Sequence, residues 1–125
     1  MAIRVDGIVV SRLAAQDLSA STVQNTIVAL DSDGKVWLAD AVTYQSFGVM
    51  IEGDVINQPC SIQISGIARV VLGATLAVNA NVGAEASTGK AIAIATTAWS
   101  IGHLVEGGSE DDLGSVMLSS ATVAV

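Results

Sequence analysis

The sequence has few of the residues that carry enzyme or metal chemistry. It contains one cysteine, Cys60, and one histidine, His103, among 125 residues. A single thiol cannot close a disulfide within the chain, and one thiol with one imidazole cannot build a cluster of metal ligands. No Gly-x-Ser-x-Gly motif accompanies the many serines, so a serine nucleophile has no recognisable setting. We therefore expect no catalytic residues, no metal site, no cofactor and no enzymatic activity.

Positive charge and long apolar segments are scarce as well. Five basic residues stand singly among twelve acidic ones, which leaves a net charge of −7. Without a basic patch the chain has nothing to neutralise phosphates, so neither nucleic acid nor an anionic membrane surface is an expected partner. No apolar run approaches the roughly eighteen residues that span a bilayer. The first residues also lack the apolar region of a secretory signal, and we expect a soluble protein that is used without export.

What the sequence does contain is short apolar segments separated by turn residues. Residues 61–65 alternate polar and apolar side chains, which is typical of a half-buried strand. Asp33-Gly34 and Thr88-Gly89 each follow an apolar segment, and they have the turn chemistry of a tight hairpin. The one candidate helix, residues 13–18, is short. The pattern predicts an all-β fold, a small antiparallel β-barrel or sandwich.

The second half of the sequence repeats the first. Ser46–Gly53 (SFGVMIEG) matches Ser100–Gly107 (SIGHLVEG) 54 positions later. The segments that end in Gly34-Lys35 and Gly89-Lys90 match at a spacing of 55, which places the loss of one residue between the two blocks. We expect a single β domain, residues 17–125, built from two pseudo-repeated halves at about residues 27–65 and 82–119.

Residues 1–16 form an N-terminal arm that has no counterpart in this repeat. The arm is rich in β-forming residues and carries two of the five positive charges of an acidic chain. An exposed strand of this kind is a liability unless it pairs or is covered. We predict that the arm docks on a neighbouring subunit or on the surface of a partner; the alternative is that it forms the first strand of its own domain. The residues expected at this contact are Ile3, Arg4, Val5, Ile8, Val10 and Arg12.

Three polar features have a plain structural interpretation. His103 falls where the first half has Val49, a place typical of a rim or interface residue. The acidic loop at residues 106–112 keeps the surface soluble. The sequence leaves a ligand role for either of these features open. Asp31–Gly34 begins like a calcium-binding loop, but the glycine and glutamate that such a loop needs further along are absent.

The hairpin lysines point to a different class of function. In lipoyl and biotinyl carrier domains a lysine at a hairpin tip carries the cofactor, and Lys35 and Lys90 follow the two predicted turns. Neither lysine has the Asp-Lys or Met-Lys-Met context that those domains use. A carrier domain or another small β binding module is therefore the alternative.

The order of the segments resembles a known family. The matching runs are DLSASTVQNTIVALDSDGKVWLAD from Asp17, SIQISGIARVVLGATLAV from Ser61, STGKAIAIAT from Ser87 and IGHLVEGG from Ile101. Together they resemble the small capsid decoration, or cement, proteins of tailed bacteriophages. The resemblance covers residues 17–119, and it lies in a Leu-Ser-Ala entry, an Asp-Gly-Lys hairpin, a Gly-Lys-Ala hairpin and a closing Ile-Gly strand.

This resemblance implies a structural role on a virus particle. Decoration proteins bind the outer surface of a phage capsid, commonly as trimers, and stabilise the expanded shell. The implied partner is the major capsid protein, the implied assembly is a homotrimer, and the implied location is the outer capsid surface of the virion, with the host cytoplasm before assembly. The arm would then contact the capsid or a neighbouring subunit. Large aromatic side chains are enriched at the centres of interfaces, and the candidate subunit anchors are Trp37, Tyr44 and Trp99.

Overall fold

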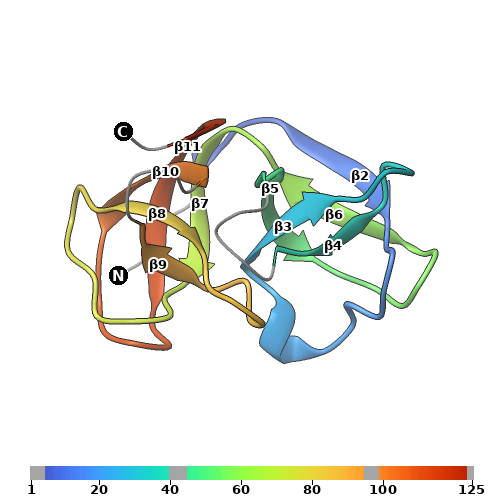
Figure 1. The fold of residues 1–125 in the computed structure, drawn as a ribbon, viewed down its shortest axis with the longest axis horizontal. Helices are drawn as coiled ribbons and strands as arrows, with labels where there is room; N and C mark the ends of the chain where they lie inside the picture. The colour runs from blue at the N-terminus through green and yellow to red at the C-terminus, as the bar shows by residue number, and fades with distance from the viewer. Residues whose placement is uncertain (1–4, 40–44, 95–98, 124–125) are drawn as a thin grey trace.

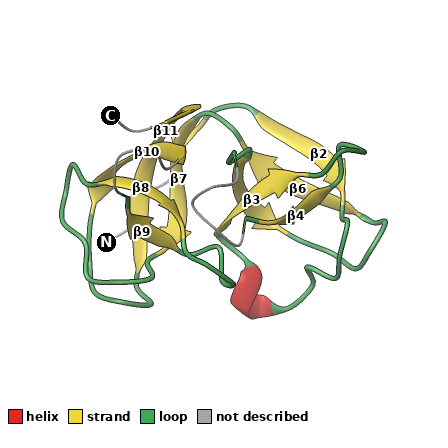
Figure 2. Ribbon diagram, viewed as in Figure 1, coloured by secondary structure: helices red, strands yellow, loops and turns green. Residues whose placement is uncertain are grey.

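The computed structural model describes residues 5–39, 45–94 and 99–123. Within these ranges the chain forms two antiparallel sheets (Figures 1 and 2). The one helical element there is the 3-10 turn η1, Ser21–Val23, and residues 13–18 form no helix. The prediction of an all-β fold is confirmed.

The sheets divide the chain into two successive halves, which we call lobe 1 (residues 9–64) and lobe 2 (residues 66–123). Lobe 1 has a five-stranded sheet in the order β2-β6-β5-β3-β4, formed by β2 (Val9–Leu13), β3 (Thr26–Leu30), β4 (Val36–Leu38), β5 (Gly48–Glu52) and β6 (Pro59–Gln63). Lobe 2 has the order β7-β11-β10-β8-β9, formed by β7 (Gly66–Val71), β8 (Asn81–Ala84), β9 (Ala91–Ala93), β10 (Trp99–Glu106) and β11 (Leu113–Val123). The short strand β1 (Val5–Asp6) adds a sixth strand beside β7. The sheets do not close into barrels, and the two lobes lie side by side in a sandwich-like arrangement (Figure 1).

The strands of the two lobes are arranged in the same order. Each lobe begins with a strand that pairs with its last strand, and each continues through a hairpin, β3–β4 in lobe 1 and β8–β9 in lobe 2. The residue after the first strand forms a parallel bridge to the second strand of the hairpin, from Ala14 to Val36 in lobe 1 and from Leu72 to Ala91 in lobe 2. The turns predicted from the sequence therefore occupy corresponding hairpins.

The spacing between the halves changes within the hairpin loop. Val28 pairs with Gly48, and Val82 pairs with Gly102, so β3 and β8 correspond at a spacing of 54 rather than the 55 expected from the sequence. The spacing becomes 55 only beyond the turn, in β4 and β9. The hairpin loop of lobe 2 therefore contains an extra residue, and the sequence match through β3 is shifted by one position.

The N-terminal arm contributes strands to both sheets. β1 pairs with β7 of lobe 2, whereas β2 pairs with β6 of lobe 1. Leu13 lies opposite Pro59 in lobe 1, as Val71 lies opposite Leu113 in lobe 2, so β2 is the counterpart of β7. The expectation that the arm lacks a counterpart is therefore wrong for β2. The match is hidden in the sequence because the segment between the first strand and the hairpin, which includes η1, is longer in lobe 1.

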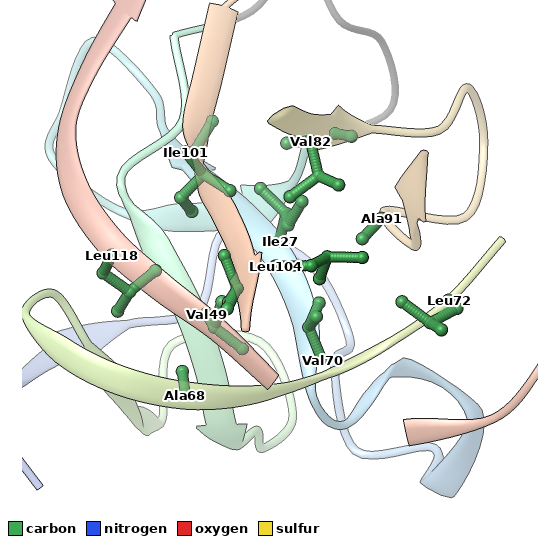
Figure 3. Packing of buried hydrophobic residues seen from close by; sticks show 14 residues of the cluster. Ile27, Val49, Ala68, Val70, Leu72, Val82, Ala91, Ile101, Leu104 and Leu118 are labelled. Atoms are coloured by element: carbon green, nitrogen blue, oxygen red, sulfur yellow. The ribbon is translucent and has the colours of Figure 1, made fainter. Parts of the chain in front are cut away.

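Buried apolar side chains form two clusters. The first lies inside lobe 1 and includes Val28, Met50 and Ile62. The second fills lobe 2, where the counterparts of these residues are completely buried. This second cluster also takes in four residues of lobe 1, which are Ile27, Ala29, Ala39 and Val49. The core of lobe 2 therefore extends across the boundary between the lobes (Figure 3).

Candidate interaction surfaces

The structure leaves part of the predicted arm contact accessible. Ile8, in the link between β1 and β2, is 58% exposed. Arg12 is exposed on β2, and Val10 is half-buried against the cluster of lobe 1. Two further predicted contacts, Ile3 and Arg4, lie outside the described residues, as does the side chain of Val5. Ile8 and Arg12 are thus the predicted arm contacts whose side chains are described and exposed.

The predicted aromatic anchors are not gathered in one lobe. Trp37 is half-buried on β4 of lobe 1 and packs against the cluster shared by the lobes. It lines a hollow of about 460 Å³ together with Ala15, Gln16 and Asp31. Trp99 is half-buried at the start of β10, in lobe 2. Tyr44 lies outside the described residues.

The lobes contact each other through two different surfaces. Lobe 1 contributes the face of its sheet that points away from its own cluster, and we call this face surface A: Ile27, Ala29, Val49 and Gln63. Lobe 2 contributes an apolar set that we call surface B: Ala68, Val70, Ala84, Ile101 and Leu118. None of these residues is more than 9% exposed, and the apolar members of both surfaces belong to one cluster. Figure 3 shows Ile27 and Val49 among side chains of lobe 2.

Hydrogen bonds accompany the apolar contact between the lobes. The carbonyl of Gly89, in the hairpin loop of lobe 2, accepts a hydrogen bond of 2.7 Å from the N–H of Ile27. The buried amide of Gln63 donates through Nε2 to the carbonyls of Ser65 and Ile67, at 2.9 and 3.2 Å. These bonds supply partners to polar groups that the contact removes from water.

The counterpart of surface B in lobe 1 is not completely buried, although its four apolar residues pack against the cluster of lobe 1. Its residues are half-buried or exposed, and they are Val10, Arg12, Leu30, Phe47 and Ile64. A cavity of about 220 Å³ lies at this surface, lined by Leu30, Gln45, Ser46 and Phe47. The guanidinium of Arg12 lies 5.9 Å from the centre of the Phe47 ring. Surface B of lobe 1 thus consists of four apolar residues and one charged residue, Arg12, whose guanidinium lies over Phe47.

In lobe 2, three counterparts of surface A are half-buried or exposed, whereas the fourth, Gly83, which replaces Ala29, is buried. Asn81 replaces Ile27 and is exposed, His103 replaces Val49 and is half-buried, and Met117 replaces Gln63 and is 41% exposed. His103 lies opposite Met117 on one neighbouring strand and opposite Asn81 on the other. The three side chains therefore share one face of the sheet.

Each hairpin is tied by its lysine to the loop before the last strand of its lobe. Lys90 Nζ lies 2.6 Å from Asp111 Oδ1, and Lys35 Nζ donates to Asn57 Oδ1 at 3.0 Å. The hydrogen bond to Asp111 raises the pKa of Lys90. Both lysines that a carrier function would use thus have a side-chain partner.

The other ionisable groups in the described ranges do not converge on a site. Among the described residues, no group of three or more histidine, cysteine, aspartate or glutamate side chains is placed to hold a metal ion. Burial raises the pKa of the Cys60 thiol. Hydrogen bonds from the hydroxyl and the N–H of Ser19 lower the pKa of Asp17, which is on the surface. No helix in the described ranges is long and apolar enough to cross a membrane.

The surfaces themselves were not predictable from the sequence. The sequence identifies His103 and Arg12 as interface residues, but no sequence pattern relates them to the contact between the two lobes. That relation depends on matching β2 to β7, and the two strands share little more than apolar character. The pairing of each strand with the last strand of its lobe is what reveals the match.

Comparison with known proteins identifies a shared fold. No protein-family model and no curated protein sequence matches the chain. Among solved structures, the N base of head fiber gp8.5 in bacteriophage phi29 is similar, with a TM-score of 0.68 and 17% sequence identity. The match covers 94% of this chain and 100% of that chain. The chain therefore has the fold of a bacteriophage head fiber base.

Proposed function

We propose that this protein is a structural component of a phage head that binds the outer surface of the capsid and stabilises the expanded shell. The observation that carries the proposal is the likeness in fold to a head fiber base over 94% of the chain. The resemblance of residues 17–119 to capsid decoration proteins supports the same role. The proposed partner is the major capsid protein, and the proposed location is the virion surface after a period in the host cytoplasm.

The arm is the proposed contact with the capsid or with a neighbouring subunit. Ile8 offers an exposed apolar side chain, and Arg12 offers one of the few positive charges on an acidic chain. An acidic groove on the capsid would attract the positive charge of Arg12, and burial of the Ile8 side chain would stabilise the contact. Ile3, Arg4, Val5 and Val10 complete the proposed contact.

The proposed assembly is a homotrimer, with Trp37, Tyr44 and Trp99 as anchors between subunits. Trp37 supports this assignment because it is only half-buried and lines a hollow at the edge strand β4. Repetition of a contact around a symmetric shell allows modest individual contacts to hold firmly. A trimer offers three copies of each contact to the capsid at once.

Co-sedimentation with capsids tests the proposed function. Expanded capsids are assembled from the major capsid protein of the same phage, and the purified protein is added in increasing amounts. We expect saturable co-sedimentation and an increase in the temperature at which the capsids break. Ile8→Asp should weaken binding about tenfold or more, since it places a charge in the contact. Val78→Asp, a change at another exposed apolar residue outside the arm, should bind as wild type. Full-length protein that neither binds nor stabilises expanded capsids would contradict the proposal.

A further inference from the structure

We propose that copies of this chain associate head to tail, with surface A of lobe 2 docking on surface B of lobe 1 of the next copy. Within one chain, surface A of lobe 1 already covers surface B of lobe 2. Two surfaces do not take part in this contact: the counterpart of surface A in lobe 2 and the counterpart of surface B in lobe 1. A second copy is the occupant that carries the matching surface for each of them.

Burial differs between the two copies of surface B. In lobe 2, Val70, Ala84 and Ile101 are at most 2% exposed because lobe 1 lies over them. Their counterparts in lobe 1 are Arg12, which is exposed, and Leu30 and Phe47, which are half-buried beside a cavity of about 220 Å³. Surface B of lobe 2 is thus buried under surface A of lobe 1, whereas surface B of lobe 1 is not buried in this way.

The same comparison holds for surface A. Val49 is 1% exposed and Gln63 is completely buried in lobe 1, whereas the counterpart of Gln63, Met117, is 41% exposed in lobe 2. A flexible apolar side chain at this position suits a contact that must adapt to its partner. The counterpart of Val49, His103, is half-buried on the same face.

The hairpin loops give this contact a defined register. The carbonyl of Gly89 accepts a hydrogen bond from Ile27 across the lobe contact. The counterpart of Gly89 is Gly34, at the tip of the lobe 1 hairpin, and the counterpart of Ile27 is Asn81. In the docked pair, Gly34 of one copy meets Asn81 of the next, as Gly89 meets Ile27 within the chain.

The differences between the two contacts make the one between copies the weaker of the two. Asn81 and His103 replace the apolar Ile27 and Val49, and Arg12 replaces Val70. These surfaces meet water when the chain is alone, whereas the contact within the chain is permanent. The Arg12 side chain, now over the Phe47 ring, must move its charge to the rim on docking, as long basic side chains do.

A contact between two unlike surfaces closes into a ring or continues as a chain of subunits, depending on the rotation between neighbours. A closed ring of three copies would use three such contacts, in addition to the aromatic anchors proposed for the homotrimer. Only the closure of this contact into a trimer rests on the proposed function; the contact between two copies does not. Self-association is measured without capsids. A protein that stays monomeric would therefore overturn this inference but say nothing about capsid binding, which the co-sedimentation assay tests separately.

Sedimentation equilibrium of the full chain from about 1 μM to about 1 mM tests the inference. We expect reversible self-association of the wild type. Met117→Asp on surface A and Leu30→Asp on surface B should each weaken it by about tenfold or more, because each replaces an apolar side chain of the contact with a charge that docking would remove from water. Arg12→Val, which restores the residue type of Val70, should strengthen it. The control is Ile56→Asp: Ile56 is 55% exposed, and its counterpart Glu110 is exposed although surface B of lobe 2 is covered by lobe 1.

Mixing the two weakened variants provides the decisive comparison. Met117→Asp keeps an intact surface B, and Leu30→Asp keeps an intact surface A in lobe 2, so the mixture should form a one-to-one dimer that grows no further. Circular dichroism checks that both variants fold, and if Leu30→Asp does not fold, Phe47→Ala replaces it. A wild type that stays monomeric throughout the range, an Arg12→Val variant that associates no more strongly, or a mixture that stays monomeric would overturn the proposal.

Discussion

The hydroxyl oxygen of Ser65 accepts a hydrogen bond of 2.7 Å from the N–H of Ile8. Ile8 lies between β1, which belongs to the sheet of lobe 2, and β2, which belongs to the sheet of lobe 1. Ser65 lies between the last strand of lobe 1 and the first strand of lobe 2. The chain passes from one lobe to the other at Ile8 and again at Ser65, and this hydrogen bond joins the two connections. The arm therefore helps to hold the lobes together.

Gly7→Ala should destabilise the protein by about 2 kcal/mol, because a β-carbon at this position would overlap the hydroxyl and the backbone carbonyl of Ser65. Ser65→Ala removes only the acceptor for Ile8, at an exposed hydrogen bond, and should cost about 0.5 kcal/mol. Urea denaturation measures both. The control Ser11→Ala changes an exposed residue of β2 and should leave stability within about 0.5 kcal/mol. Equal stability of all three variants would contradict a stabilising contact between the connection at Gly7 and Ile8 and the connection at Ser65.

Asn57→Asp should stabilise lobe 1 by about 0.5 kcal/mol, since it converts the hydrogen bond from Lys35 into an ion pair like that of Lys90 with Asp111. The backbone tolerates the change, because Asn57 and Asp111 have similar positive φ values of 66° and 69°. The measurement is thermal denaturation at low and high salt. The gain should shrink as salt rises, and it should vanish in a Lys35→Met background. A gain that persists in that background would show a different origin.

Cys60 should make the protein less stable at alkaline pH. Burial raises the pKa of its thiol above the ordinary value of 9.0, so the folded state holds its proton at a pH where the unfolded chain has lost it. The stability linked to this thiol is complete below about pH 9 and declines as pH rises from there through the folded pKa. Denaturation midpoints from pH 7 to pH 10.5 measure the decline, which should be smaller in Cys60→Ala. An identical decline in the variant would rule out the thiol as its source.

Gln63 should be important for the contact between the lobes. Its amide donates to the carbonyls of Ser65 and Ile67 from a completely buried position. Gln63→Leu keeps the volume but removes both donors, so two carbonyls near the crossing lose a partner, and we expect a loss of about 2 kcal/mol. The counterpart change Met117→Leu, on the exposed surface A of lobe 2, should alter stability by less than about 0.5 kcal/mol. Comparable losses in both variants would contradict the distinct environments of the two positions.

The sequence was sufficient to predict the elements whose signals are local. Asp33-Gly34 and Thr88-Gly89 have turn chemistry that does not depend on distant residues, and both hairpins are present. The alternation in residues 61–65 likewise identifies β6. Local patterns also sufficed to recognise a repeat, because Gly48 and Gly102 hold the same place in β5 and β10.

The sequence was insufficient where the answer depends on pairing between distant strands. β2 and β7 correspond because each lies beside the last strand of its lobe, and no local pattern records that. The one-residue shift in β3 has the same cause, since only its pairing with β5 fixes the register. The accessible surfaces follow from burial in the folded chain, which differs between Val49 and His103 although the repeat aligns them.

A cryo-electron microscopy map of expanded capsids saturated with this protein shows whether it binds the outer surface of the shell. We expect density for the two-lobed fold on that surface, with the arm around Ile8 against the major capsid protein or a neighbouring copy. Capsids incubated with the Ile8→Asp variant should show weaker density at the same positions. A map in which the outer surface carries no added density at saturating protein, or in which the fold lies inside the shell, would contradict the proposed binding to the outer surface.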